Sequence, residues 1–271
     1  MVGFLRRQKH YSRIPGYLLA TPAKALRKFL GLRFSCILRV PTALPRQLRS
    51  KCNTPFRIES YWDQLLSDVD IVSQVLQDYF CCPALLPHSN YVVFDLGANF
   101  GGYSLTMAPQ ILMVHAFEPI ADNCDRLRRH VQLNALANVV VNEIALSDRE
   151  GEAVFYSLDR GSQGTLEAEF AARRDERPPM HVRCGTLDRY VKDNRIERID
   201  IIKMDVEGHE VQALMGASNT LQQTSQIVLE WHGQRNKRET TELLEAAGFE
   251  LKTELVHDGQ TGILHFVNRQ D

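Results

Sequence analysis

Residues 92–101 constrain the fold of this chain more than any other stretch. Three apolar residues, 92–94, are followed by Asp95 and then by Gly97 and Gly101. A short apolar run that stops at glycines predicts a buried parallel strand and a tight turn. The residues after Gly101 have helical spacing, so a helix is expected to begin there. Because the first amides of a helix have no intrahelical partner, this turn predicts a cofactor site.

Two classes of cofactor use such a turn. A dinucleotide-binding turn has the spacing Gly-x-Gly-x-x-Gly, in which the middle glycine makes room for a pyrophosphate. This chain has Asn99 at that position. The order of Asp95, Gly97 and Gly101 instead resembles the first motif of class I S-adenosylmethionine (SAM) methyltransferases, Asp-x-Gly-x-x-x-Gly. An acid at residue 95 suits the cationic amino-acid end of SAM. The alternative is a strand, turn and helix that bind no ligand.

Predicted strands and helices alternate from residue 91 onward, which indicates a mostly parallel sheet with helices on both faces. Residues 153–156 are expected to return in a hairpin beside the strand at 139–145. Residues 158–181 lack periodicity and are interpreted as an insertion or lid. Strands are expected at residues 114–117, 139–145, 199–204 and 227–229, and a closing antiparallel pair at 249–255 and 262–267.

Charge is distributed unevenly along the chain. Residues 1–58 contain 13 Lys and Arg and no acidic residue, which leaves 19 basic and 33 acidic residues to the rest. Attachment of this basic head to anionic lipid or to a partner is one interpretation. An organelle transit peptide and a loosely ordered extension are the others. The net charge of −1 predicts no bulk attraction to nucleic acid.

The six cysteines have no metal-ligand spacing, so free thiols in a reducing compartment are expected. No stretch reaches the roughly 18 apolar residues of a membrane span, and no secretory signal is convincing. We therefore expect a cytoplasmic protein, with peripheral membrane contact through residues 1–58 as an option. The oligomeric state cannot be read from the sequence.

Four segments follow one another at class I spacing. They are the 94–101 turn, His115 to Pro119, Ala145 to Asp148 with Gly151, and Ile202 to Glu210, which contains Asp-Val-Glu-Gly. Together they resemble the FkbM family of SAM-dependent methyltransferases over about residues 90–250. The resemblance implies a Rossmann-like class I fold with a seven-stranded, mostly parallel sheet and an antiparallel last strand. It also implies O-methylation of a small-molecule or glycan acceptor.

Charge, helical spacing and the resemblance together divide the chain into a basic extension (1–58), a helical lead-in (59–90) and a methyltransferase domain (91–271). On the resemblance, Glu118, at the end of the second strand, should bind the ribose of SAM through both hydroxyls. The adenine edge should lie near residues 142–146. The implied cofactor-binding residues are Asp95, Gly97, Asn99, Gly101, Glu118, Asn142 and Ala145.

An alcohol that accepts a methyl group must also lose its proton, commonly to a histidine or a carboxylate. Asp205 follows a predicted strand and is expected to contact the reacting region. His232 and His209 are candidate bases, with His232 preferred. Alternatively, Asp205, Glu230 and His232 could hold Mg²⁺ or Mn²⁺ that binds a substrate diol. These three residues come from separate segments, so no local spacing supports a metal site.

Two other functions are weighed against a methyltransferase. A nucleotide-dependent oxidoreductase would share Glu118, but Asn99, Asp95 and the closing antiparallel pair count against it. A non-catalytic binding module would dock through the basic head, residues 1–58. The sequence favours the methyltransferase and leaves the acceptor open.

Overall fold

The structure is a computed structural model of the 271-residue chain. It describes residues 33–38, 56–61, 85–158, 163–167 and 179–270, together with single residues between 68 and 79. Most of the basic head therefore lies outside the described residues. None of the helices within the described ranges has the length and apolar character needed to cross a bilayer.

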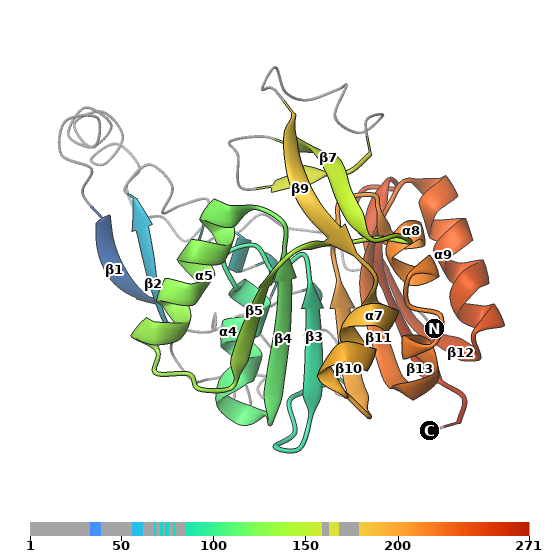
Figure 1. Ribbon diagram of the computed structural model, residues 1–271. Coiled ribbons are helices and arrows are strands. Elements are labelled where there is room, and N and C mark those ends of the chain that lie inside the picture. Colours follow the sequence, from blue (N-terminus) through green and yellow to red (C-terminus); the bar gives the residue numbers. More distant parts are fainter. Residues whose placement is uncertain are drawn as a thin grey trace.

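A seven-stranded sheet forms the centre of the molecule (Figure 1), in the order β12-β13-β11-β10-β3-β4-β5. Neighbouring strands from β11 through β5 pair in parallel, whereas β13 pairs antiparallel with both β11 and β12. This confirms the predicted class I sheet with an antiparallel last strand. The strands are β3 (Val92–Leu96), β4 (Met113–Glu118), β5 (Val139–Glu143), β10 (Ile199–Met204), β11 (Thr224–His232), β12 (Phe249–Val256) and β13 (Thr261–Asn268).

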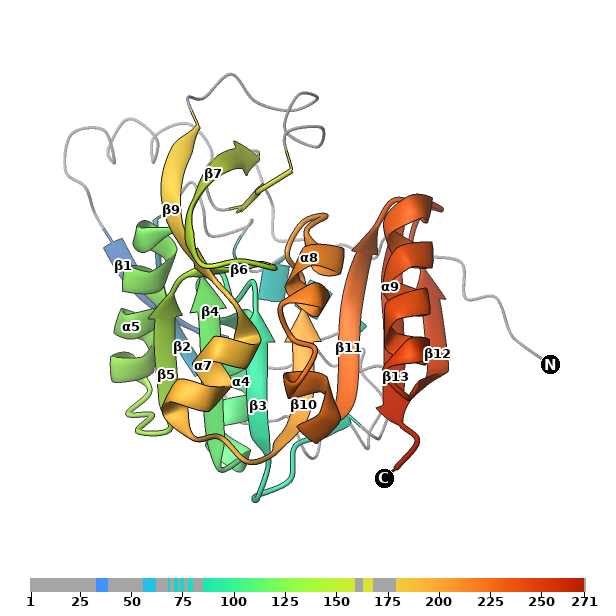
Figure 2. The same ribbon diagram turned by 45° about the vertical axis from the view of Figure 1, so that its right-hand side comes forward.

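Helices cover both faces of this sheet, and each face has its own apolar core. One core includes Tyr103 and Leu105 of α4 and Leu127 of α5. The other core includes residues of α7, α8 and α9, which lie in front of the sheet in Figure 2. The central strand β10 is buried along its whole length because both of its faces are covered. The helices are α4 (Gly102–Met107), α5 (Ala121–Leu133), α7 (Leu187–Asn194), α8 (Glu210–Met215) and α9 (Gln234–Ala246), with 3-10 turns η2 (Ala108–Gln110) and η4 (Thr220–Gln223).

A smaller sheet rises above the carboxyl ends of the central strands (Figures 1 and 2). Its order is β6-β9-β7-β8, built from β6 (Ala145–Leu146), β7 (Gly151–Leu158), β8 (Gln163–Thr165) and β9 (Met180–Gly185). The expectation that residues 153–156 return beside 139–145 was wrong, because β7 pairs with β8 and β9. The predicted insertion at 158–181 contains β8 and the start of β9, so part of it is ordered sheet.

The described part of the head includes an antiparallel pair of strands, β1 (Arg33–Leu38) with β2 (Phe56–Tyr61). Its second strand contacts α5, where the backbone amide of Arg57 donates to Asn134 Oδ1 at 2.7 Å. Asn134 Nδ2 returns a hydrogen bond to the carbonyl of Arg57 at 2.8 Å. The lead-in expected from residue 59 therefore starts with the end of a strand. Val72 and Tyr79 are buried in the core beside α4, as the helical spacing of residues 60–80 predicted.

Candidate active site

A crevice of about 800 Å³ opens at the carboxyl ends of β3, β4, β10 and β11, beneath the smaller sheet. Open parallel sheets bind their ligands at this edge, and this volume falls in the usual range of ligand pockets, about 300–1,000 Å³. Leu166 and Glu167 of the segment after β8 line it from above. Val75 and Tyr79 of the lead-in line it from the side, so this segment contributes both to the core and to a wall of the crevice.

Residue 97 must be a glycine because the loop after β3 packs closely against the loop after β10. Its φ is +75°, and a Cβ at this position would come within 1.7 Å of the carbonyl oxygen of Asp205. The amides of Gly97 and Ala98 both donate to the carbonyl of Phe117 at 3.0 Å. The β3 turn is thus fixed against the loops that follow β4 and β10. Gly97 and Asn99 line the crevice.

Gly101 and Asp95 support the turn from behind and do not line the crevice. A Cβ on Gly101, whose φ is +100°, would lie 2.2 Å from Leu127 of α5, so this glycine permits close helix packing. The fully buried Asp95 accepts hydrogen bonds from the amide and hydroxyl of Ser104 at 3.1 and 2.6 Å. Its other oxygen lies 3.3 Å from Lys203 Nζ. Any effect of Asp95 on a cofactor is therefore indirect.

The sequence analysis assigned no role to Lys203. It is 3 % exposed on β10, and its ammonium donates to the carbonyl of Gly97 at 3.1 Å while pairing with Asp95. It also lines the crevice. A lysine inside an apolar strand was the available signal, because a buried charge needs an acidic partner.

Glu118 and Asn99 meet at the end of β4. One carboxylate oxygen of Glu118 accepts from the amide of Asn99 at 2.9 Å, and the other accepts from Ile120 N and Asn123 Nδ2. Burial raises the pKa of Glu118 to about 7, although these hydrogen bonds and Lys203 oppose the shift. A carboxylate oxygen can accept two hydrogen bonds. The oxygen that faces Asn99 can therefore also accept one from a ligand hydroxyl.

The two residues expected near adenine are placed differently. Ala145 lines the crevice together with Ile144 and Leu146. Asn142 does not line it, because its side-chain amide donates to the carbonyl of Ala116 at 3.1 Å between neighbouring strands. The apolar surface of residues 144–146 can contact a flat aromatic ring, whereas Asn142 stabilises the sheet.

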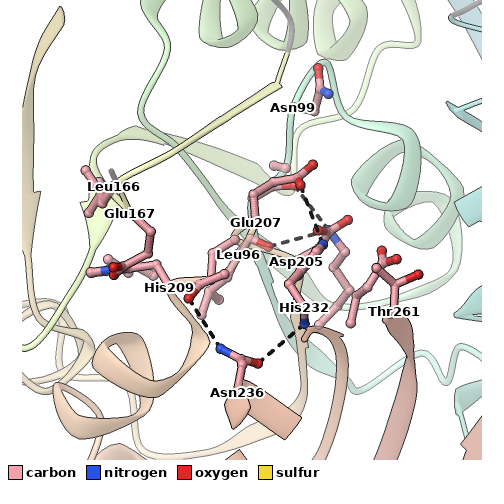
Figure 3. A pocket seen from close by; sticks show the side chains of 18 of the residues that line it. Leu96, Asn99, Leu166, Glu167, Asp205, Glu207, His209, His232, Asn236 and Thr261 are labelled. Atoms are coloured by element: carbon pink, nitrogen blue, oxygen red, sulfur yellow. Dashed lines mark hydrogen bonds and ion pairs between the residues drawn. The ribbon is translucent and has the colours of Figure 1, made fainter. Parts of the chain in front are cut away.

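Asp205, Glu207 and His232 converge at the opposite end of the crevice (Figure 3). They offer one ligand atom each, and these atoms all lie within 4.8 Å of one another. His232 Nδ1 lies 2.9 Å from the fully buried Glu210, and its Nε2 lies 3.5 Å from Glu207. Glu207 is brought there by a left-handed backbone with φ +54°. The sequence analysis did not assign Glu207 or Glu210 a role.

The protonation of these groups is set by burial and mutual charge. Burial lowers the pKa of His232, but Glu210, followed by Glu207 and Asp205, outweighs that effect and raises it to about 10. Burial raises the pKa of Asp205, and the neighbouring Glu230 raises it further. The raised pKa of His232 favours its imidazolium form at neutral pH.

Glu230 also lines the crevice but belongs to a different ion pair. It lies 3.6 Å from His257 Nδ1, and His257 Nε2 lies 3.2 Å from Asp78. The grouping of Asp205, Glu230 and His232 expected from the sequence is thus replaced by one in which Glu207 takes the second carboxylate position.

His209 lines the crevice with both ring nitrogens engaged. Nδ1 lies 2.6 Å from Glu167, and Nε2 lies 3.0 Å from the hydroxyl of Ser147 (Figure 3 shows His209 with Glu167). These contacts join the loop after β10 to the smaller sheet above the crevice. His209 is therefore better placed to hold the two parts together than to accept a substrate proton.

Comparison with known proteins agrees with this architecture. The family model described as the methyltransferase FkbM domain matches residues 95–251. A hexuronic acid methyltransferase, AglP, of Haloferax volcanii is 26% identical over 200 residues, covering 73% of this chain and 76% of the relative. A 2-O-methyltransferase, NoeI, of Sinorhizobium fredii is 27% identical over 166 residues, covering 56% of this chain and 67% of the relative.

Among solved structures, methyltransferase FkbM from Methylobacillus flagellatus aligns with a TM-score of 0.50 at 16% identity. The alignment covers 82% of this chain and 57% of that chain, so this chain spans a little over half of that protein's length. At this identity the likeness concerns the fold alone.

Proposed function

Because this chain belongs to the FkbM family of methyltransferases, we propose that it transfers the methyl group of SAM to an oxygen of a small, hydroxyl-rich acceptor such as a sugar. The observation that carries the proposal is the two-ended crevice. Glu118 and Asn99 lie where β4 and β3 end, and Asp205 with its charged neighbours lies where β10 and β11 end, on the other side in the strand order. Family membership argues against the oxidoreductase alternative. The docking alternative concerns residues 1–58, which are mostly outside the described part of the chain.

The crevice has features that suit SAM. The second lone pair on the Glu118 oxygen beside Asn99 can accept from a ribose hydroxyl. The surface of Ile144, Ala145 and Leu146 can pack against adenine. Bound SAM supplies a methyl group on a sulfonium, so much of the protein's task is to align the acceptor with it. The contacts that fix the β3 turn to the β10 loop hold both ends of the crevice in one geometry.

The acceptor end favours a ligand rich in hydroxyl groups. Hydrogen-bonding side chains line it from α8, from the start of α9 and from the β12–β13 turn, namely Gln212, Gln234, Arg235, Asn236, Gln260 and Thr261. Two relatives are named for methylation of a hexuronic acid and for 2-O-methylation, which is consistent with a sugar-like acceptor.

Asp205 is the proposed proton acceptor. An imidazolium has no lone pair for a proton, and the raised pKa of His232 makes it charged at neutral pH. The raised pKa of Asp205 makes it a stronger base than an ordinary aspartate, which suits general-base catalysis near neutrality. His232 then stabilises the charge of the site, and His209 holds the loop that carries it.

The proposal is tested by incubating the full chain with SAM labelled in its methyl group and a panel of hexuronic acids, neutral hexoses and an aromatic diol. We expect label in an alkali-stable methyl ether of one sugar. Label that mild alkali releases would indicate a carboxyl ester and contradict methylation of a hydroxyl. If the chain binds SAM but transfers label to no compound of the panel, the proposal of a sugar-like acceptor is contradicted.

Asp205→Asn keeps the size of the side chain and removes its basicity. We expect turnover of the accepted sugar to fall by about 10²–10⁴-fold, the usual contribution of a general base, while the Kd for SAM changes less than about twofold. Full activity in this variant would remove Asp205 from the proton transfer.

A further inference from the structure

We propose that Asp205, Glu207 and His232 form a site for a divalent cation such as Mn²⁺ at the acceptor end of the crevice. The inference deepens the proposed methyl transfer and rests on it for the role of the cation. The three ligand atoms lie within 4.8 Å of one another. Ligand atoms about 2.0–2.2 Å from one metal ion are at most about 4.4 Å apart. A small closure of the side chains therefore suffices.

Asp205 gives an independent indication of a ligand. Its Oδ1 is buried and has no hydrogen-bond partner among the described residues, although the side chain lines the crevice. A buried carboxylate oxygen without a donor is costly, because its lost hydration is not replaced. A cation between Asp205 and Glu207 would supply the missing partner.

His232 is held as metal-binding histidines are held. Its Nδ1 lies 2.9 Å from Glu210, which is fully buried and also accepts from Gly208 N at 3.1 Å and Asn236 Nδ2 at 2.7 Å. A carboxylate behind one ring nitrogen orients the other toward the metal and increases its basicity. Nε2 faces Glu207 as a result.

The surrounding charge favours an added cation. The carboxylates of Asp205, Glu207 and Glu210 gather around this end of the crevice, whereas the charge of Glu230 is paired with His257. Lys203 is committed to Asp95 and to the carbonyl of Gly97. A divalent ion would balance this excess of negative charge.

The ligand set indicates which ion is preferred. Carboxylates suit Mg²⁺ and Mn²⁺, whereas imidazole suits the transition metals, so two carboxylates with one imidazole favour Mn²⁺ over Mg²⁺. Asp205, Glu207 and His232 would hold the cation, which would supply a Lewis acid that lowers the pKa of an acceptor hydroxyl bound to it. Asp205 would accept the proton of that hydroxyl through its second oxygen. The acceptor oxygen would then bond to the methyl carbon as the carbon–sulfur bond of SAM breaks.

The test is a titration of the full chain with Mn²⁺, followed by the loss of the free-ion EPR signal, with SAM binding measured calorimetrically on the same samples. We expect one saturable Mn²⁺ site. Glu207→Gln should weaken Mn²⁺ at least tenfold. Glu230→Gln removes the same charge from the same crevice and should change Mn²⁺ affinity less than twofold. SAM binding by Glu207→Gln should stay within twofold of the unmodified chain, which shows that the variant is folded.

Two results would overturn the cation site while leaving the proposed function intact. One is an unmodified chain that binds SAM but no Mn²⁺, and the other is a Glu207→Gln variant that binds Mn²⁺ as tightly as the unmodified chain. If Glu230→Gln loses Mn²⁺ and Glu207→Gln does not, the grouping with Glu207 is wrong. A folded chain that binds Mn²⁺ but no SAM would instead contradict the methyl-transfer proposal.

Discussion

Replacing Gly97 with alanine tests whether the contact between two strand-end loops builds the crevice. The new Cβ would come within 1.7 Å of the carbonyl oxygen of Asp205, and the residue would keep a φ of +75°. The left-handed backbone costs an alanine about 1–2 kcal/mol. Relief of the clash adds about 1–3 kcal/mol, the usual cost of overpacking. We expect Gly97→Ala to lower the free energy of unfolding by about 2–5 kcal/mol.

Gly259→Ala is the matched control for the backbone effect. Gly259 has a φ of +82°, and a Cβ there would meet nothing within 4 Å. The free energy of unfolding of Gly259→Ala should fall only by the cost of the left-handed backbone, about 1–2 kcal/mol. Urea unfolding with equal m-values compares the two variants directly. Equal destabilisation by both substitutions would refute the close approach of the two loops.

Two further variants test the cofactor end and the charge network. Glu118→Ala should weaken SAM binding by more than about 1 kcal/mol, the scale of a lost charge-assisted hydrogen bond. The control is Glu143→Ala, which removes an exposed carboxylate from the end of the next strand. If calorimetry gives both variants the same affinity for SAM, the ribose contact of Glu118 is absent. Hydrogen bonds to Asp78 and then to Glu230 raise the pKa of His257 to about 9, so its stabilising contribution is complete below about pH 6.5 and is lost as the pH rises to 9. His257→Gln should therefore be less stable than the unmodified chain at pH 6.5 and approach it above pH 9, and a pH-independent gap in urea midpoints would contradict this.

The main sheet could be predicted because its signals are local. Apolar runs that stop at glycine or acidic residues gave β3, β4 and β10, and the closing pair β12 and β13 followed from alternation near the C-terminus. The smaller sheet could not be predicted, since β9 is polar on its exposed face and pairs with β7 across a long insertion. Its pairing depends on tertiary contacts that leave no periodic signal.

The cofactor end of the site was more predictable than the acceptor end. Glu118 follows directly from its position after a strand, and the structure places it against Asn99. The choice between Glu207 and Glu230 depends on long-range partners. His257 lies beside Glu230. Glu207 has a left-handed backbone conformation, which directs its side chain toward His232. Neither effect can be read from spacing along the chain.

The most direct test of the central claim is a calorimetric titration of the purified full chain with SAM and, separately, with NADH. We expect saturable binding of one SAM and no heat from NADH, because Asn99 occupies the position of the glycine that a pyrophosphate needs. NADH binding without SAM binding by a folded chain would contradict the methyltransferase assignment of the crevice.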